Sequence, residues 1–347
     1  MFLILNNQIK KMMSLIKSKL SIEPWWVTGI VDSEGNFSIN YNINTKKCTF
    51  SFKVTQNGNS VAILYYLKEF FKVGNINIDN RKTNGYKFIV SNRKDLIDVI
   101  IPHFEKYPLE GSKHLDFLDF KNCILLMEES SNNIGKVLSI KKNMNRERSY
   151  EQRWSYLRDK NFHLKSEWVQ AFIDGEGTFQ CRIADTISRN SKYVSVNPTL
   201  EIAQKSHDVF VLKAIIEYFG IGYLKPKYDI FSLKDSLKSR DVSRAIFNQH
   251  EVIIKFVDKY PMLTCKQLDY LDWKEIIMLK IEGARPPAVV RSATHRTEEG
   301  KQRMLELKLG MNRGRLLNSN LFNNSDKLLI MNSTYFENNT KVSEDNE

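Results

Sequence analysis

Cysteine is scarce in this sequence, and long apolar runs are absent. The four cysteines, Cys48, Cys123, Cys181 and Cys265, form no C-x-x-C pair. Neither a zinc knuckle nor a disulfide framework is therefore indicated, and a reducing compartment fits best. No apolar run approaches the roughly 18 residues that a membrane-spanning helix requires. We therefore expect no membrane partner.

Acidic residues are in the minority. The chain has 40 Asp and Glu against 52 Lys and Arg, a net charge of +12. This balance favours a polyanionic partner, nucleic acid above all, although many basic proteins are only soluble basic proteins. Residues 1–20 contain no acid and are mildly amphipathic. They fit either an organelle-targeting segment or a poorly ordered leader.

The sequence contains an internal repeat. The stretch VTGIVDSEGNFSINY, residues 27–41, aligns with VQAFIDGEGTFQCRI, residues 169–183, so that Glu34 superposes on Glu176. After each stretch come strand-like runs, TFSFKVTQ in the first copy and TLEIAQ in the second, and later EKYPLEGSKHLDFLDF matches DKYPMLTCKQLDYLDW. So many matches in one order indicate a duplication.

Each copy is expected to fold as helix, two strands, helix, two strands and two further helices. We divide the chain into an N-terminal extension (1–24), repeat 1 (25–147), a linker (148–166), repeat 2 (167–315) and a C-terminal tail (316–347). The polar linker is expected to run over the surface. The Asn- and Ser-rich tail is expected to be loosely ordered, and residues 282–300 to form a loop.

The two acidic motifs combine small residues with a terminal carboxylate. Each expected helix carries small residues four apart on one face, Gly29 and Ser33 in one copy and Ala171 and Gly175 in the other. If these faces pack together, Glu34 and Glu176 meet at the ends of adjacent helices. Two close carboxylates repel each other unless a cation compensates, and Mg²⁺ prefers oxygen ligands. Such a site suits phosphodiester hydrolysis.

The motifs VTGIVDSEG and VQAFIDGEG resemble those of LAGLIDADG homing endonucleases, of the single-chain, two-repeat kind that organellar introns encode. The resemblance runs from about residue 25 to about residue 315. It implies an α+β fold of two pseudo-symmetric αββαββα half-domains, each with a four-stranded antiparallel sheet, which together form a DNA-binding saddle.

The resemblance also implies an activity and its setting. Members of the family make a double-strand break in a long DNA target by Mg²⁺-dependent hydrolysis and so promote intron mobility. Ca²⁺ is expected to support binding without cleavage. We expect a double-stranded DNA partner, a monomer, and an organellar, mitochondrial location.

Roles carry over to the residues at matching positions. The expected metal ligands are the carboxylates of Glu34 and Glu176 and the backbone carbonyls of Ser33 and Gly175. Catalytic roles carry over to Glu34, Glu176, Gln56, Gln204, Lys113 and Lys266. Asp32 and Asp174 lie one position off the glutamate face by the resemblance and are expected to be structural.

The strands after each motif alternate between apolar and polar residues. In the first copy Phe37, Ile39, Tyr41 and Ile43 take the apolar parity. The alternate residues form a polar face, and the resemblance implies that this face contacts DNA. Its residues are Asn36, Ser38, Asn40, Asn42, Asn44, Thr49, Ser51 and Lys53 in copy 1, and Thr178, Gln180, Arg182, Ser195, Asn197, Thr199 and Glu201 in copy 2. Amide and basic side chains can pair with base edges in the major groove, although any solvated strand shows this alternation.

Two other functions remain open at this point. Some proteins of the family are maturases, which bind their own intron RNA and assist splicing, with or without cleaving DNA. A DNA-binding regulator on the same fold is a third reading. The presence of both Glu34 and Glu176 favours a nuclease over such a regulator.

Overall fold

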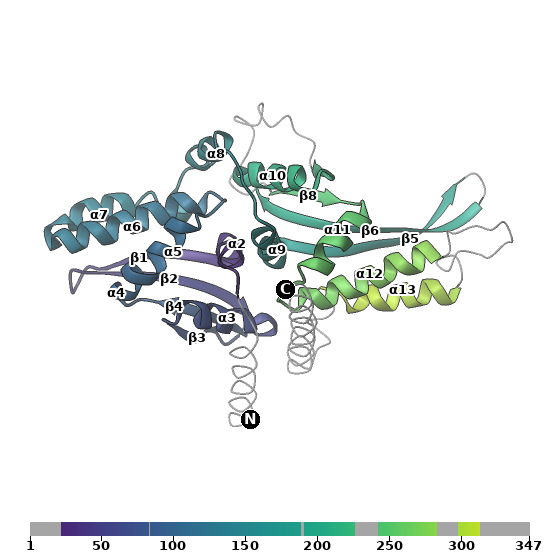
Figure 1. Ribbon diagram of the computed structural model, residues 1–347, viewed down its shortest axis with the longest axis horizontal. Helices are drawn as coiled ribbons and strands as arrows, with labels where there is room; N and C mark the ends of the chain where they lie inside the picture. Colours follow the sequence, from purple (N-terminus) through teal and green to yellow (C-terminus); the bar gives the residue numbers. More distant parts are fainter. Residues whose placement is uncertain (1–21, 83, 189–190, 226–241, 283–297, 313–347) are drawn as a thin grey trace, which may run out of the picture.

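The structure, a computed structural model, describes residues 22–82, 84–188, 191–225, 242–282 and 298–312. Two half-domains meet at a central pair of helices (Figure 1). The first half contains α2 (Pro24–Glu34), β1 (Gly35–Asn42), β2 (Lys47–Asn57), η1 (Gly58–Ser60), α3 (Ala62–Phe71), β3 (Asn75–Asn80) and β4 (Gly85–Val90). It continues with α4 (Arg93–Asp95), η2 (Leu96–Ile100), α5 (Ile101–Lys106), α6 (Lys113–Glu129), η3 (Ser131–Asn133), α7 (Ile134–Lys141) and η4 (Asn145–Glu147).

The second half repeats this order after a connecting helix, α8 (Tyr150–Arg158). It contains α9 (Ser166–Glu176), β5 (Gly177–Ser188), β6 (Ser191–Lys205), η5 (Ser206–Asp208), α10 (Val209–Phe219), β7 (Tyr223–Lys225), β8 (Val242–Phe247), α11 (His250–Lys259), α12 (Lys266–Glu282) and α13 (Glu298–Gly310). The predicted α+β fold with two αββαββα half-domains is confirmed.

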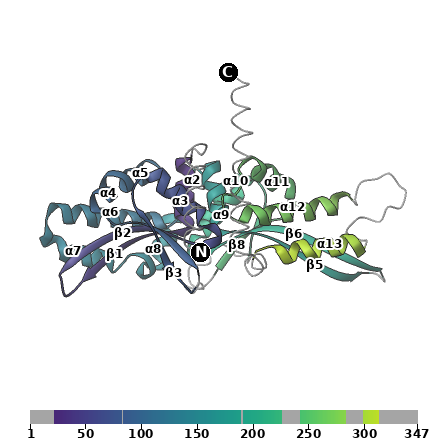
Figure 2. The ribbon, with the colours of Figure 1, turned by 90° about the horizontal axis from the view of Figure 1, so that it is seen from below.

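Each half contains a four-stranded antiparallel sheet, with the strand orders β1-β2-β4-β3 and β5-β6-β8-β7. One face of each sheet is apolar and packs against helices. Phe37 of β1 lies opposite Phe52 of β2, and both are fully buried beside Phe104 of α5. In Figure 2 both sheets curve along one side of the molecule, with α2, α3, α5, α10 and α11 on the other.

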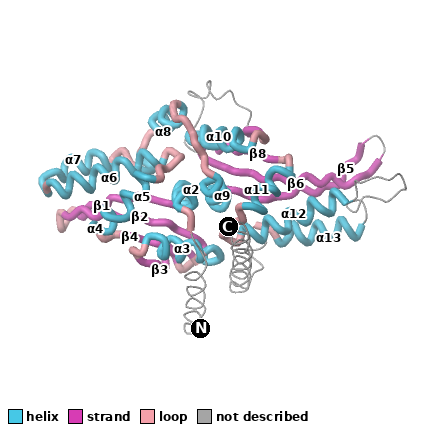
Figure 3. Tube along the Cα trace, in the orientation of Figure 1, coloured by secondary structure: helices cyan, strands magenta, loops and turns pink. Residues whose placement is uncertain are grey.

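The motif helices α2 and α9 pack side by side between the two sheets (Figure 3). Small residues permit this, as the sequence predicted. A methyl group on Gly29 would lie 2.5 Å from the carbonyl oxygen of Trp168 and 2.9 Å from Cβ of Ala171. One on Gly175 would collide with the Ser33 hydroxyl. The helix ends that carry the acids are therefore fixed relative to each other.

The linker does not simply run over the surface. Residues 150–158 form α8, which begins with a capping box between Ser149 and Gln152. Trp154 and Leu157 are buried in the core of the second half. The prediction of a surface linker is wrong for these two side chains, because an amphipathic turn inside a polar segment has found apolar partners.

The first polar strand ends earlier than its alternation predicted. Ile43 and Asn44 lie in the turn after β1, where Ile43 is 77% exposed. The side-chain oxygen of Asn42 accepts hydrogen bonds from the backbone N–H groups of Asn44 (3.0 Å) and Thr45 (3.1 Å). Asn42 therefore closes the turn, and Ile43 does not belong to the apolar face.

Several predictions fall outside the described residues. These are the predictions for residues 1–21, for most of the loop before α13 (283–297), and for the C-terminal tail. In the part of the chain that is described, the cysteines are free, and no helix is long and apolar enough to cross a membrane.

Candidate active site

Glu34 and Glu176 are the last residues of α2 and α9, so the packing of these helices brings the two carboxylates together. Burial, and then the negative charge of Glu34, raise the pKa of Glu176 to about 7. Burial also raises the pKa of Glu34, against the opposing charges of Lys113 and Lys266. The end of the helix pair is therefore a place where negative charge is crowded and poorly solvated.

Gln56 and Gln204 are the next-to-last residues of β2 and β6, the second strand of each half. Both side chains lie on the same face of their sheet as the buried apolar residues. They come after the last apolar residue of the strand, where they reach the carboxylates of Glu34 and Glu176. Gln56 hydrogen-bonds Glu34, and Gln204 hydrogen-bonds Glu176. The structure therefore places both glutamines beside the acid of their own half.

Lys113 and Lys266 are the first residues of α6 and α12, and each reaches the end of the motif helix of its own half. The Lys113 ammonium donates to the carbonyls of Val31 (2.7 Å), Asp32 (2.8 Å) and Ser33 (3.4 Å). The Lys266 ammonium donates to those of Ile173 (3.0 Å) and Gly175 (3.2 Å). Each lysine therefore neutralises the negative end of a helix dipole next to the carboxylates.

A cavity of about 300 Å³ shows how the two halves combine. Its lining includes Ser33 and Lys113 from the first half and Glu176 and Gln204 from the second. We call this group the Lys113 site. The repeat then predicts a Lys266 site formed by Gly175, Lys266, Glu34 and Gln56. Each site would take its lysine and backbone carbonyl from one half, and its carboxylate and glutamine from the other.

The aspartates of the motifs have structural contacts. Asp32 accepts hydrogen bonds from the backbone N–H groups of Glu110 (2.7 Å) and Gly111 (3.1 Å) and from the indole of Trp168 (2.8 Å). Asp174 accepts from the backbone of residues 263 and 264 and from the Thr264 hydroxyl. Burial raises the pKa of both carboxyls to about 6. The two aspartates thus hold the loops that precede the lysines.

The donor atoms at the helix ends suit a hard cation. They comprise two carboxylates, two side-chain amides and the carbonyls of Ser33 and Gly175, which are oxygen ligands of the kind that Mg²⁺ accepts. A carbonyl oxygen that already accepts from a lysine retains a second lone pair. The described residues contain no cluster of three or more His, Cys, Asp or Glu side chains able to hold a metal elsewhere.

The polar face of the first sheet brings together most of the side chains assigned to it. The register pairs Asn36 with Lys53, Ser38 with Ser51 and Asn40 with Thr49, so that these six share one face. Asn40 and Thr49 are exposed, whereas Asn36 lines the cavity. The Asn36 amide donates to the side-chain oxygen of Asn145 (3.1 Å), and Ser38 donates to Asn36.

The second sheet has an equivalent face. The register places Thr178 opposite Glu201, Gln180 opposite Thr199, Arg182 opposite Asn197, and Ala184 opposite Ser195. Glu201 lies 3.9 Å from the guanidinium of Arg244, a residue of β8. The predicted polar residues of copy 2 therefore lie together, and β8 adds a basic residue that the sequence analysis did not assign.

Other side chains near the site were missed because they come from later elements. Asn145 donates to the Phe37 carbonyl (2.9 Å), and Asn312 donates to that of Phe179 (2.8 Å), so each ties the end of its repeat to the first strand. The repeated Met-Asn-Arg signal in the sequence could have identified them. The register of the outer strands also places six further residues on the polar faces of the two sheets: Asn75, Asn77, Lys87, Tyr223, Lys225 and Arg244.

Comparison with known proteins decides the family. A family model described as LAGLIDADG endonuclease matches residues 27–124 and residues 171–277, one region in each half. The chain belongs to the LAGLIDADG endonuclease family. The two matched regions cover most of both half-domains and include both motif glutamates, which confirms the family named from the sequence.

Several curated relatives of this LAGLIDADG protein come from fungi. Two from Neurospora crassa are named probable intron-encoded endonuclease 3 (26% identical, 78% of this chain and 53% of the relative) and probable intron-encoded endonuclease 2 (26%, 83% and 64%). Probable intron-encoded endonuclease Cox1-I1b from Schizosaccharomyces pombe is 30% identical over 63% of this chain and 54% of its own length. The chain thus spans between half and two thirds of these relatives.

Solved structures of LAGLIDADG proteins share the fold. The homing endonuclease I-SmaMI bound to cleaved DNA is 25% identical, with a TM-score of 0.70, covering 86% of this chain and 99% of its own. I-LtrWI bound to target DNA is 27% identical, with a TM-score of 0.68, covering 84% and 98%. Both are matched over nearly their full length, which confirms the expected pair of half-domains.

Proposed function

We propose that this protein is a site-specific homing endonuclease that makes a double-strand break in a long DNA target and thereby promotes the mobility of its intron. The observation that carries this proposal is the meeting of Glu34 and Glu176 at the ends of packed helices, between two sheets with polar outer faces. The names of the relatives and the DNA in the similar structures support it.

The sheets would bind the DNA and the helix ends would cut it. The net charge of +12 favours binding to a phosphate backbone. On the exposed faces, side chains such as Asn40 and Gln180 would contact base edges in the major groove. The two cleavage sites would then lie at the centre of the DNA target, one for each strand.

Within each site the residues have separate tasks. Glu34 and Glu176, with the carbonyls of Ser33 and Gly175, would hold Mg²⁺, which when bound supplies activation of a water and neutralisation of the leaving oxygen. Gln56 and Gln204 would fix the orientation of the carboxylates that they hydrogen-bond. Replacing Mg²⁺ by Ca²⁺ is expected to preserve binding and stop cleavage.

The lysines would complete each site. Lys113 and Lys266 hold the carbonyls at the ends of the motif helices and present positive charge beside the carboxylates. This charge would stabilise the extra negative charge that develops on the phosphate in the transition state. Because both halves belong to one chain, a monomer would carry the complete pair of sites. We propose a mitochondrial location, since the relatives are named as intron-encoded proteins of fungi.

One assay tests this function. Purified protein is incubated with a DNA duplex spanning the intron-insertion point of its host gene, with Mg²⁺ and in parallel with Ca²⁺. We expect a double-strand break with short 3′ overhangs in Mg²⁺, and a stable complex without cleavage in Ca²⁺. Specific binding without any cleavage in Mg²⁺ would contradict a nuclease. Preferential binding of the intron RNA would favour a maturase.

A further inference from the structure

The two composite sites differ in the residue that precedes the lysine. Ser112 precedes Lys113 and is almost fully buried at the start of α6. Its counterpart Cys265 precedes Lys266 at the start of α12. The contacts of Ser112 and Cys265 are therefore one place where the repeat loses its symmetry.

Ser112 joins the linker helix to the second half-domain. Its hydroxyl accepts a hydrogen bond from the guanidinium of Arg153 in α8 (3.0 Å). Its own hydroxyl and backbone N–H groups donate to the carboxylate of Asp208 in the second half, and Arg153 and Lys113 place positive charge near that carboxylate. The start of α6, and with it Lys113, is therefore fixed from two directions.

Arg153 is itself held rigidly. Its side chain is only 12% exposed and lies 3.4 Å from the carboxylate of Asp116, which is 4% exposed. It also donates to the carbonyl of Asn145. The same aspartate binds Arg148 at 2.9 Å. A buried guanidinium with three acceptors has little freedom, so it can define the position of the groups that it contacts.

The counterpart contact is neutral. The Cys265 thiol lies 3.5 Å from the hydroxyl of Ser60, the residue that matches Asp208 in the repeat. Burial raises the pKa of Cys265, so the thiol stays uncharged at neutral pH. A serine hydroxyl and a neutral thiol interact weakly compared with an arginine, a serine and a carboxylate. Lys266 therefore receives much weaker support from this direction.

We propose that Arg153 and Asp208 are positioning residues for Lys113, so that the linker helix is a working part of one cleavage site only. This proposal rests on the proposed endonuclease function. The strand cut at the Lys113 site then depends on α8, whereas the strand cut at the Lys266 site does not. Loss of the positioning contact converts the protein into an enzyme that nicks one strand faster than the other.

The test resolves the two strands. A target duplex carries a different fluorescent label on each strand, and single-turnover cleavage in Mg²⁺ is followed with enzyme in excess. The Lys113→Met variant identifies the strand that the Lys113 site cuts. Arg153→Ala is expected to slow that strand by about 10- to 100-fold, as displacement of a catalytic group typically does. The other strand should be cut at the wild-type rate, with unchanged affinity for DNA in Ca²⁺.

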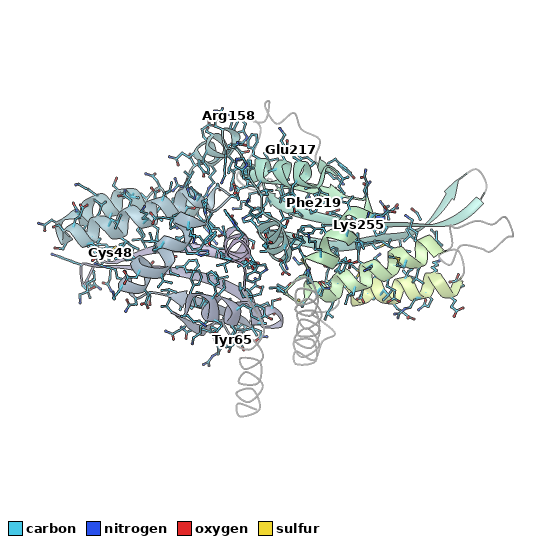
Figure 4. The ribbon with its side chains drawn as sticks, viewed as in Figure 1. Cys48, Tyr65, Arg158, Glu217, Phe219 and Lys255 are labelled. Carbon is cyan, nitrogen blue, oxygen red and sulfur yellow. The ribbon has the colours of Figure 1, made fainter. Side chains whose placement is uncertain are left out.

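Two further variants separate positioning from general damage to the fold. Arg153→Lys keeps a charged donor and should recover part of the rate on the affected strand. Asp208→Asn keeps the shape but removes the negative charge that faces Arg153 and Lys113, so it should slow the same strand. Arg158→Ala is the matched control, because Arg158 lies on the outer end of the same helix, 41% exposed, and pairs with Asp159 (Figure 4).

The outcomes distinguish the two proposals. If the wild-type protein cuts neither strand, the endonuclease function itself fails. If the wild type cuts both strands and Arg153→Ala slows both equally, or neither, the positioning role is overturned while the function stands. If Arg153→Ala slows the two strands unequally but Arg153→Lys recovers none of the lost rate, a role for the charged donor is contradicted.

Discussion

Glu34 and Glu176 lie together at the ends of two packed helices, and the negative charge of Glu34 raises the pKa of Glu176. Burial contributes most to the rise of the Glu176 pKa to about 7, and the negative charge of Glu34 contributes next, while Gln204 and the two lysines oppose it. The two acids end helices whose packing leaves no room for a methyl group on Gly29 or Gly175. The protein therefore holds two like charges together at a cost to its own stability, which is typical of a site that binds a cation.

The raised pKa of Glu176, caused by burial and then by the charge of Glu34, predicts a pH-dependent effect of Glu176→Gln on folding. The pKa of Glu176 is raised from 4.5 to about 7, so its stabilising contribution is complete below pH 4.5 and is lost as pH rises through 7. The glutamine variant does not titrate. In metal-free buffer, Glu176→Gln should therefore gain about 1 to 3 kcal/mol in free energy of unfolding relative to wild type between pH 5 and pH 8.

Urea unfolding at both pH values measures this difference. The matched control is Glu217→Gln, because the Glu217 side chain is 66% exposed on α10 and pairs with Lys213. The control should differ from wild type by no more than about 0.5 kcal/mol, as is usual for an exposed substitution. Parallel pH profiles for wild type and Glu176→Gln would contradict a buried Glu176 carboxyl with a raised pKa.

Close packing of the motif helices predicts that Gly29→Ala is destabilising. The added methyl group would meet the Trp168 backbone, which cannot move without shifting α9. We expect a loss of about 1 to 3 kcal/mol in free energy of unfolding. Gly135→Ala in α7 is the control, since nothing lies within 4 Å of the added methyl group. It should stabilise the protein by up to about 1 kcal/mol. Equal effects would exclude tight packing at Gly29.

The sequence predicted what local patterns determine. Period-two alternation placed Asn40 and Thr49 on one face, and small residues four apart placed Glu34 beside Glu176. It could not predict contacts that depend on distant elements. The hydrogen bond from Asn145 to the Phe37 carbonyl joins residues 108 apart in the sequence, and Asn145 also adopts a positive φ. Hydrophobic periodicity does not indicate which residue adopts such a backbone conformation.

Two predictions from local sequence patterns were wrong, one based on composition and one on alternation. The linker is polar overall, yet the Trp154 ring lies 5.3 Å from that of Phe210 in the second core. Apolar area outweighed the average polarity of the segment, because burying one tryptophan contributes about 2 to 3 kcal/mol. The alternation of β1 also continued past its end at Asn42, where an asparagine side chain closes the turn.

The exposed position of Asn40 predicts a role in base readout. Asn40 faces outward opposite Thr49, whereas Ile39 is 4% exposed in the core. Asn40→Ala should cost about 1 to 3 kcal/mol in binding and relax preference at one or two adjacent base pairs of one half-site. A binding profile over all single-base variants of the target measures this. Equal weakening on every target would assign Asn40 to phosphate or solvent.

Ile39→Ala is the matched comparison for Asn40→Ala. Removing this buried side chain should lower the free energy of unfolding by about 2 to 5 kcal/mol. Base preference should remain as in the wild type. If Ile39→Ala altered the target profile as Asn40→Ala does, the two faces of β1 would not have the separate roles assigned to them.

The basic charge of the chain predicts binding that weakens steeply with salt. Each phosphate neutralised should contribute a slope of about −0.9 in the logarithm of the binding constant against the logarithm of salt concentration. Titration of the target duplex in Ca²⁺ at several potassium chloride concentrations measures the slope. A nearly flat profile would contradict an extensive track of phosphate contacts along the two sheets.

The most direct test of the account is cleavage by Glu34→Gln and Glu176→Gln. Each variant is assayed for double-strand breaks in Mg²⁺ and for affinity in Ca²⁺ on the same duplex. Because a double-strand break requires both composite sites and each acid is assigned to one of them, each substitution should abolish double-strand breaks, leaving at most nicking, while affinity for the target is largely retained. Double-strand cleavage at the wild-type rate in either variant would contradict the assignment of the catalytic centre to this pair of helix ends.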